Sequence, residues 1–126
     1  MSLENKTILV VEDDDGNRQL IKELLGFQSY TVVEAESGQQ ALSALAKNAI
    51  DLILMDISLP DISGLTLMRK IRAQQQYTQL PIIALTAYVR PSDEQAALAA
   101  GATRHIPKPV NIQTLLSEIQ RQLATV

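Results

Sequence analysis

Five short apolar runs rich in β-branched residues recur along this chain, and stretches with helical spacing separate them. The runs cover residues 7–11, 31–33, 52–55, 82–85 and, more weakly, 103–106. The first, third and fourth runs are almost wholly apolar, as expected for strands buried on both faces of a sheet. Alternation of such strands with helices is typical of a parallel sheet covered on both sides. The sequence therefore predicts an α/β fold, a doubly wound (βα)5 arrangement with five parallel strands.

Apolar residues between the runs repeat at helical spacing, so each predicted helix has one face that can pack against the sheet. These sets are Leu20, Ile21, Leu24 and Leu25; Ala41, Leu42, Leu45 and Ala46; Leu67, Met68 and Ile71; and, within 112–123, Leu115, Leu116, Ile119 and Leu123. Ser37 with Gln40 predicts the start of the second helix, and Asn111 predicts the cap of the last. Residues 93–100 are mostly alanine and predict the weakest helix, which Gly101 should end.

Charge and composition exclude several classes of function. The 126 residues carry a net charge of −3 without a dense Lys or Arg cluster, which argues against direct DNA binding. Without cysteine and with one histidine, the chain cannot form disulfides, thiolate sites or multi-histidine metal sites, so any metal must bind oxygen. The N-terminus lacks a secretory signal and no apolar run has membrane length, so we expect a cytoplasmic protein without membrane contact.

Polar side chains follow four of the five predicted strands. Glu12 and Asp13 come after the first run, Asp56 ends the third, Thr86 ends the fourth and Lys108 follows the fifth. Open parallel sheets bind ligands beyond the carboxyl ends of their strands, where the strand order reverses. With the flavodoxin-like order 2-1-3-4-5, the first and third strands are neighbours. Glu12 and Asp13 would then face Asp56 across one crevice.

Three carboxylates in one crevice need a cation or raised pKa values, because two unit charges about 4 Å apart repel by about 4 kcal/mol at an effective dielectric of roughly 20. Mg²⁺ binds few carboxylates and keeps several waters, so it leaves room for a phosphate oxygen. We therefore predict that Asp56 is the nucleophile for a phosphoryl group. Lys108 would be the second cation, and Thr86 a hydroxyl donor to that group. Asp14 is expected only to complement the dipole of the first helix.

Four motifs occur in order along the chain: ILVVEDD at 8–14, LMDISLP at 54–60 followed by Gly64, ALTAY at 84–88, and IPKP at 106–109. Together they resemble the response-regulator receiver family of two-component signalling over essentially the whole chain. The resemblance implies a phosphorelay protein that takes a phosphoryl group on Asp56 with help from Mg²⁺. It implies a signalling protein that assists its own phosphorylation and dephosphorylation, and not an enzyme with a separate substrate.

The resemblance also assigns roles to single residues. Asp13 would bind Mg²⁺ directly, Glu12 through a water, and Ser58 through its backbone carbonyl. Thr86 and Lys108 would contact the phosphoryl group. These assignments complete the site that the strand ends alone indicate.

Further expectations concern the switch and the lifetime of the phosphoryl group. The Lys108-Pro109 peptide is expected to be cis. His105 stands where the family often has Tyr or Phe, and it has either a packing role or a switch role in which the imidazole changes rotamer when Thr86 moves. Ser58 and Tyr88 are expected to flank the path of the water that removes the phosphoryl group.

The implied phosphoryl donor is a sensor histidine kinase or a histidine phosphotransfer protein, and the implied output is a downstream protein partner. The donor is expected to dock near Asn17, Arg18 and the loop after Lys108. The length suits a single domain with a core at about residues 7–124 and no output domain after the last helix.

Two alternatives stay open. The chain could be the excised receiver of a hybrid kinase, or an interaction module with a receiver fold that works without phosphorylation. A metal-dependent phosphatase is disfavoured, because Ser58 stands where the second acid of such an enzyme would be needed. A nucleotide or flavin binder is disfavoured too, because Gly16 alone does not make a glycine-rich phosphate loop.

Overall fold

The computed structural model describes residues 6–87 and 91–124 of the chain. Its centre is a five-stranded parallel sheet in the order β2-β1-β3-β4-β5. The strands are β1 (Thr7–Val11), β2 (Thr31–Ala35), β3 (Leu52–Asp56), β4 (Ile82–Thr86) and β5 (Arg104–Pro107). The helices are α1 (Asp15–Phe27), α2 (Gly38–Lys47), α3 (Gly64–Arg72), the short 3₁₀ helix η1 (Gln75–Tyr77), α4 (Pro91–Ala100) and α5 (Ile112–Ala124). The predicted fold class and strand order are confirmed.

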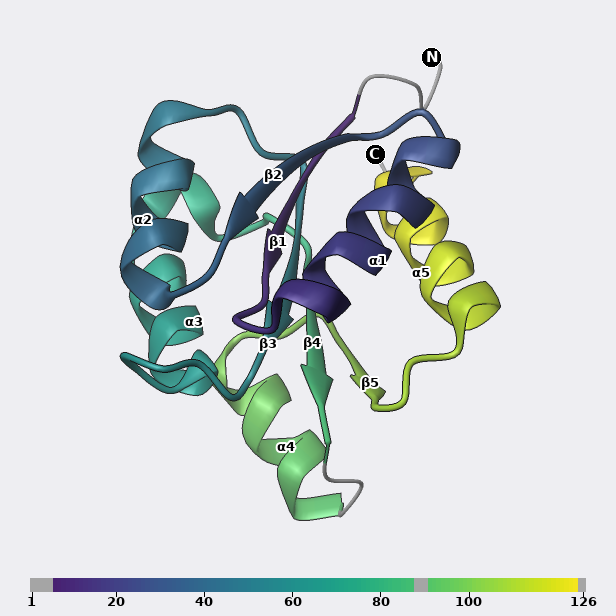
Figure 1. Cartoon of the computed structure of the whole chain (residues 1–126). Helices are drawn as coiled ribbons and strands as arrows, with labels where there is room; N and C mark the ends of the chain where they lie inside the picture. Colours follow the sequence, from purple (N-terminus) through teal and green to yellow (C-terminus); the bar gives the residue numbers. More distant parts are fainter. Residues whose placement is uncertain (1–5, 88–90, 125–126) are drawn as a thin grey trace.

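The helices cover both faces of this sheet (Figure 1). α1 and α5 pack on one face, against side chains such as Ile8 and Leu54. α2, α3 and α4 pack on the other, against side chains such as Leu9 and Ile53. Successive residues of a strand point to opposite faces, so covering both faces requires apolar residues along the central strands up to their carboxyl ends, where Asp56 and Thr86 lie. Burying one such Leu or Ile side chain stabilises the fold by about 1.5–3 kcal/mol.

The side-chain caps predicted for the helices are confirmed. Ser37 Oγ accepts a hydrogen bond from the Gln40 N–H at 3.2 Å, and this bond caps α2. Asn111 Oδ1 accepts one from the Thr114 N–H at 3.0 Å at the start of α5. Asp14 caps α1 by accepting from a backbone N–H of its first turn at 2.8 Å. The carboxylate of Asp14 therefore serves the helix, as expected, and not the crevice.

Three predicted boundaries differ from those of the structure. α4 begins at Pro91 and not at residue 93, because proline fits the first position of a helix, where the N–H is not needed. β2 runs to Ala35 and not to residue 33, because its last two residues pair with Val10 and Val11 of β1. Backbone pairing does not depend on side-chain polarity, so the apolar run underestimated this strand. β5 covers Arg104–Pro107, one residue later than predicted.

α4 packs through little apolar surface and is anchored at its C-terminal end. Its buried residues are Ala97 and Ala100. Gly101, which follows, has φ of +122°, and its carbonyl accepts two hydrogen bonds from the Arg72 guanidinium at 2.9 and 2.7 Å. A Cβ at Gly101 would lie 2.6 Å from Arg72 Cγ, so both the backbone conformation and the close contact require glycine. The predicted end of the helix at Gly101 is confirmed.

The loop between β3 and α3 is fixed at two points. The Asp61 carboxylate accepts hydrogen bonds from the N–H groups of Gly38, at 2.8 Å, and Gln39, at 3.0 Å. These bonds hold the pKa of Asp61 below its ordinary value. A Cβ at Gly64 would lie 2.7 Å from the carbonyl oxygen of Asp56, so glycine lets α3 start directly behind this strand end. The backbone on both sides of Ser58 is therefore held in place.

Candidate functional site

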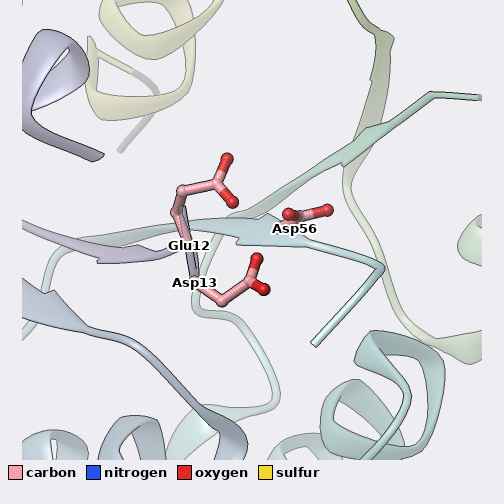
Figure 2. Close-up of side chains that lie close together, drawn as sticks. All are labelled: Glu12, Asp13 and Asp56. Carbon is pink, nitrogen blue, oxygen red and sulfur yellow. The ribbon is translucent and has the colours of Figure 1, made fainter. Parts of the chain in front are cut away.

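Three carboxylates meet at the carboxyl ends of β1 and β3. The register of these two strands pairs Val11 with Met55, so the residues that follow them, Glu12 and Asp56, lie side by side. One carboxylate oxygen from each of Glu12, Asp13 and Asp56 lies within 4.8 Å of the others (Figure 2). Glu12 is 2% exposed and Asp56 is 3% exposed, whereas Asp13 faces solvent. The cluster expected from the strand order is present.

Lys108 brings a cation into this cluster from the loop after β5. Its Nζ lies 3.0 Å from Asp56 Oδ2 and 3.3 Å from Glu12 Oε1. Burial lowers the pKa of Lys108, but its hydrogen bonds and ion pairs with Asp56 and Glu12 outweigh burial and raise the pKa above its ordinary value. The Lys108-Pro109 peptide is cis, as predicted. Lys108 thus stays an ammonium ion and contacts two of the three acids.

The crowding of negative charge in the cluster affects the pKa of Glu12. Its pKa is raised to about 7, first by burial and then by a shared hydrogen bond with Asp56 and the negative charge of that residue. Lys108 opposes this shift, although one ammonium ion cannot balance three carboxylates. When all three acids are ionised, the cluster therefore keeps a net negative charge.

The donor set fits a hard divalent cation. Mg²⁺ prefers oxygen ligands and few carboxylates, and the three acids provide carboxylate oxygens within reach of one ion. The Ser58 N–H donates to Asp56 Oδ1 at 3.0 Å, which orients that carboxylate. The ligand role expected for the Ser58 carbonyl stays a prediction.

Thr86 lies on β4, the neighbour of β3, and His105 lies on β5, the next strand after β4 in the sheet. Thr86 ends β4, is 6% exposed, and its carbonyl accepts a hydrogen bond from the Lys108 N–H at 2.6 Å. His105 lies in β5 opposite Ala84, and its buried Nε2 has no hydrogen-bond partner among the described residues. Tyr88, the other expected neighbour of the water path, lies outside the described residues. The switch roles of Thr86 and His105 stay predictions.

A cavity next to the cluster was not predicted from the sequence. Its volume is about 520 Å³, and it lies between α1 and α5, with Glu12 and Lys108 among its lining residues. Leu20 also lines it and is 51% exposed, so the expectation that Leu20 packs on the sheet is wrong. Helical periodicity identified the apolar stripe of α1, but one edge of that stripe faces the cavity.

Arg18 is a second feature that the sequence reasoning placed differently. Its side chain is only 11% exposed and its guanidinium donates to the Glu12 carbonyl oxygen at 2.9 Å. The one local signal for this was Asp15, three residues earlier on the same helix, with which Arg18 forms an ion pair. Most of the Arg18 side chain is therefore covered by its contacts, and it offers little surface to a docking partner.

Comparison with known proteins gives consistent matches. The family model of the response regulator receiver domain matches residues 8–120. The polar-differentiation response regulator DivK of Brucella ovis is 31% identical over 118 residues, which cover 94% of this chain and 96% of that protein. The chemotaxis protein CheY4 of Vibrio cholerae has a TM-score of 0.89 and 34% identity, with 94% of this chain and 99% of that chain covered.

A further similar structure contains a metal ion. It is the receiver domain of the sensor histidine kinase PA1611 of Pseudomonas aeruginosa, which was crystallised with magnesium coordinated in its active-site cleft. Its TM-score is 0.88 at 35% identity, with 96% of this chain and 99% of that chain covered.

Within residues 6–87 and 91–124 of the present chain, no helix has the length and apolar character needed to cross a bilayer.

The raised pKa of Glu12 gives a test of the cluster in metal-free protein. In EDTA, the Glu12 carboxyl carbon should titrate near pH 7 in a ¹³C NMR experiment. Asp56→Asn should lower this pKa, because a shared hydrogen bond and a negative charge are lost, but burial should keep it above 4.5. Asp51→Asn, before the other end of β3, is the control and should leave Glu12 unchanged.

The same shift predicts a direction for stability. A carboxyl group whose pKa is raised in the folded state binds its proton more tightly when folded than when unfolded. Its contribution to the free energy of unfolding is therefore complete below pH 4.5 and is lost as the pH rises through about 7. Urea unfolding of wild type and Glu12→Gln in EDTA would measure this, and an equal pH dependence of both proteins would contradict the assignment.

Proposed function

This chain belongs to the response regulator receiver domain family, and from that premise we propose that Asp56 accepts a phosphoryl group with the help of Mg²⁺ and thereby changes a partner-binding surface. The family makes it a signalling protein and not a classical enzyme. The observation that carries the proposal is Lys108 Nζ in contact with both Asp56 and Glu12 inside a cluster of three carboxylates. A buried acid beside an ammonium ion and a cation site is what phosphoryl transfer to a carboxylate requires.

We assign the metal to the acids of the cluster. Asp13 and Asp56 would hold Mg²⁺ directly, Glu12 would act through a water, and the Ser58 carbonyl would complete the protein ligands. Bound there, Mg²⁺ supplies positive charge to the oxygens of the phosphoryl group. The affinity of the site for Mg²⁺ should rise with pH through about 7, because the cation competes with the proton on Glu12.

The residues of the chain divide the transfer between them. An Asp56 carboxylate oxygen forms the bond to phosphorus, while the bond from phosphorus to the donor histidine nitrogen breaks and that nitrogen keeps the electron pair. The Lys108 ammonium attracts the equatorial oxygens, on which the transferring group spreads its negative charge. The Ser58 N–H, 3.0 Å from Asp56 Oδ1, keeps the carboxylate oriented during the attack.

The switch would run through Thr86 to α4 and β5. The Thr86 hydroxyl would move to the phosphoryl group, and His105 would change rotamer to occupy the space left behind. Shifting a two-state equilibrium from 1:99 to 99:1 takes about 5.5 kcal/mol, which a few charge-assisted hydrogen bonds can supply. α4 suits such a change because Ala97 and Ala100 are its buried residues, so little packing is lost when it moves.

The phosphoryl donor would be a histidine kinase or a histidine phosphotransfer protein. We place its docking site on the cavity between α1 and α5, because that cavity borders Lys108 and exposes apolar residues such as Leu20 and Ile112. Asn17 also lines the cavity. Arg18, which the sequence suggested as part of this surface, is left out because its side chain is largely buried. We place the protein in the cytoplasm, with a protein partner as output and no direct contact with DNA.

A second candidate is a receiver that works inside a hybrid kinase. Two similar structures, from Syntrophus aciditrophicus and Pseudomonas aeruginosa, are receiver domains of histidine kinases. The chemistry on Asp56 would be the same in both cases, and only the source of the phosphoryl group and the partner would differ. A module that works without phosphorylation is less well supported, because all three acids and Lys108 are present and Lys108 contacts Glu12 and Asp56.

The first test is phosphorylation by acetyl phosphate. Incubation with acetyl phosphate and Mg²⁺ should add about 80 Da in an intact mass spectrum, as a hydroxylamine-labile adduct of a carboxylate. Asp56→Asn and chelation by EDTA should each remove the adduct. Persistence of the adduct in Asp56→Asn would assign the chemistry to another residue, and its absence from wild type with acetyl phosphate and kinase donors alike would favour a phosphate-independent module.

The proposed switch predicts that Thr86→Ala affects the conformational response but not phosphorylation itself. This variant should still be phosphorylated, but it should lose most of the backbone NMR shift changes in α4 and β5 that phosphorylation causes in wild type. The missing hydroxyl can no longer follow the phosphoryl group, which is the physical reason. Thr66→Ala, the same change on the exposed face of α3, should keep them. A full wild-type response in Thr86→Ala would rule out this route.

A substitution in the proposed docking surface should slow phosphorylation by a protein donor but not phosphorylation by acetyl phosphate. Leu20→Arg should reduce phosphotransfer from a phosphorylated histidine phosphotransfer domain by about tenfold or more, because it puts a charge into an apolar contact. Phosphorylation by acetyl phosphate should not change. Leu98→Arg on α4, where the leucine is similarly exposed, is the control and should behave like wild type with both donors. Equal losses with both donors would place the effect in the site and not in docking.

A further inference from the structure

Arg18 is the most heavily bonded side chain near the acid cluster. Its guanidinium donates to the carboxylates of Glu34 at 3.3 Å and Glu36 at 3.0 Å, and it forms an ion pair with Asp15. Another of its N–H groups donates to the backbone carbonyl of Glu12 at 2.9 Å. One residue of α1 thus connects the loop after β1 with the end of β2.

The bond to Glu12 bears directly on the position of Asp13. The Glu12 N–H donates to the Ala35 carbonyl at 3.0 Å, and its carbonyl accepts from Arg18. That carbonyl belongs to the peptide unit that leads into Asp13. Asp13 itself lies in neither a strand nor a helix and its side chain faces solvent. The orientation of its carboxylate therefore depends on how firmly this peptide unit is held.

The bonding pattern suits arginine and no other side chain. A planar guanidinium has five N–H donors in a fixed fork, so it can bond to a carbonyl and to several carboxylates at the same time. Lysine has a single ammonium group and can keep only part of this pattern. Lys22, one turn further along α1, also pairs with Glu34, at 3.2 Å, yet its ammonium has no described contact with Glu12.

We propose that Arg18 is a positioning residue for the divalent cation site, which keeps the Asp13 carboxylate near Asp56 by linking the Glu12 carbonyl, through its guanidinium, to Glu34 and Glu36 at the end of β2. This inference rests on the proposed function, because it takes the acid cluster to be a Mg²⁺ site. Charge alone would act in the opposite direction, since a cationic side chain near the site repels Mg²⁺. If Arg18 acts by positioning, its removal should weaken Mg²⁺ binding. If it acts only through its charge, its removal should strengthen Mg²⁺ binding.

The test is the Mg²⁺ affinity of Arg18→Ala, Arg18→Lys and the control Lys22→Ala, measured by calorimetry with Mg²⁺ alone. Arg18→Ala should bind Mg²⁺ about tenfold or more weakly, as is usual when a partner that orients a metal ligand is removed. Arg18→Lys should fall between Arg18→Ala and wild type. Lys22→Ala should match wild type, because it removes a contact with Glu34 and leaves the Glu12 carbonyl bonded.

NMR and unfolding measurements distinguish positioning from a merely structural role. In EDTA, the amide resonances of Glu12 and Asp13 should shift in Arg18→Ala while those of β4 and β5 stay in place. Urea unfolding shows whether each variant is folded, and if Arg18→Ala is not, Arg18→Lys decides the question. A lower stability in Arg18→Ala with unchanged Mg²⁺ affinity would assign Arg18 to the fold alone and overturn the proposal.

The Mg²⁺ measurements distinguish failure of the positioning role from failure of the proposed function. Unchanged or tighter Mg²⁺ binding by both Arg18 variants would overturn the positioning role and leave the proposed function intact. Absence of Mg²⁺ binding by the wild type would overturn both. Weaker binding by Arg18→Ala, partial recovery with lysine and wild-type binding by Lys22→Ala would together support the assignment.

Discussion

The repulsion between Glu12, Asp13 and Asp56 is the constraint on which the rest of the site depends. The parallel pairing of β1 and β3 puts two of these acids side by side in a place that water hardly reaches. Two features reduce the repulsion: Lys108 contacts both buried acids, and the pKa of Glu12 is raised, so that this acid holds its proton more tightly. The excess of negative charge in the cluster is what the proposed binding of a metal ion, and with it of a phosphoryl group, would offset. The same excess of negative charge is therefore the feature on which the proposed chemistry depends.

Much of this could be predicted because burial on two faces leaves no ambiguity about where a strand ends. A central strand must be apolar as long as both its faces are covered, so the first polar residue that ends or follows it marks the carboxyl edge of the sheet. Glu12, Asp56 and Thr86 were found in this way. The flavodoxin-like strand order assumed for such a sheet then decided which of them are neighbours. The resemblance to a known family supplied the cis peptide before Pro109.

The parts that were missed depend on contacts between distant segments. Arg18 reaches Glu34 and Glu36, which lie sixteen and eighteen positions further along the chain, and only the end point of β2 brings them together. That end point was itself underestimated, because strand pairing continued past the apolar run. Exposure of Leu20 was missed for a related reason, since periodicity defines the apolar face of a helix but not how far the neighbouring helix covers it. The size of the pKa shift at Glu12 likewise depends on burial, which no local pattern reports.

The sheet that carries the site also divides the molecule into two separate layers of packing. Among the described residues, the buried apolar side chains beneath α1 and α5 form one cluster and those beneath α2, α3 and α4 another, because a strand sends successive residues to opposite sides. Changes of side-chain volume on one side can therefore be absorbed without repacking the other. A lineage of such proteins can alter the surface that meets one partner while the opposite surface and the acids between them stay as they are. The architecture thus permits one recognition surface to change while the geometry of the acid cluster is kept.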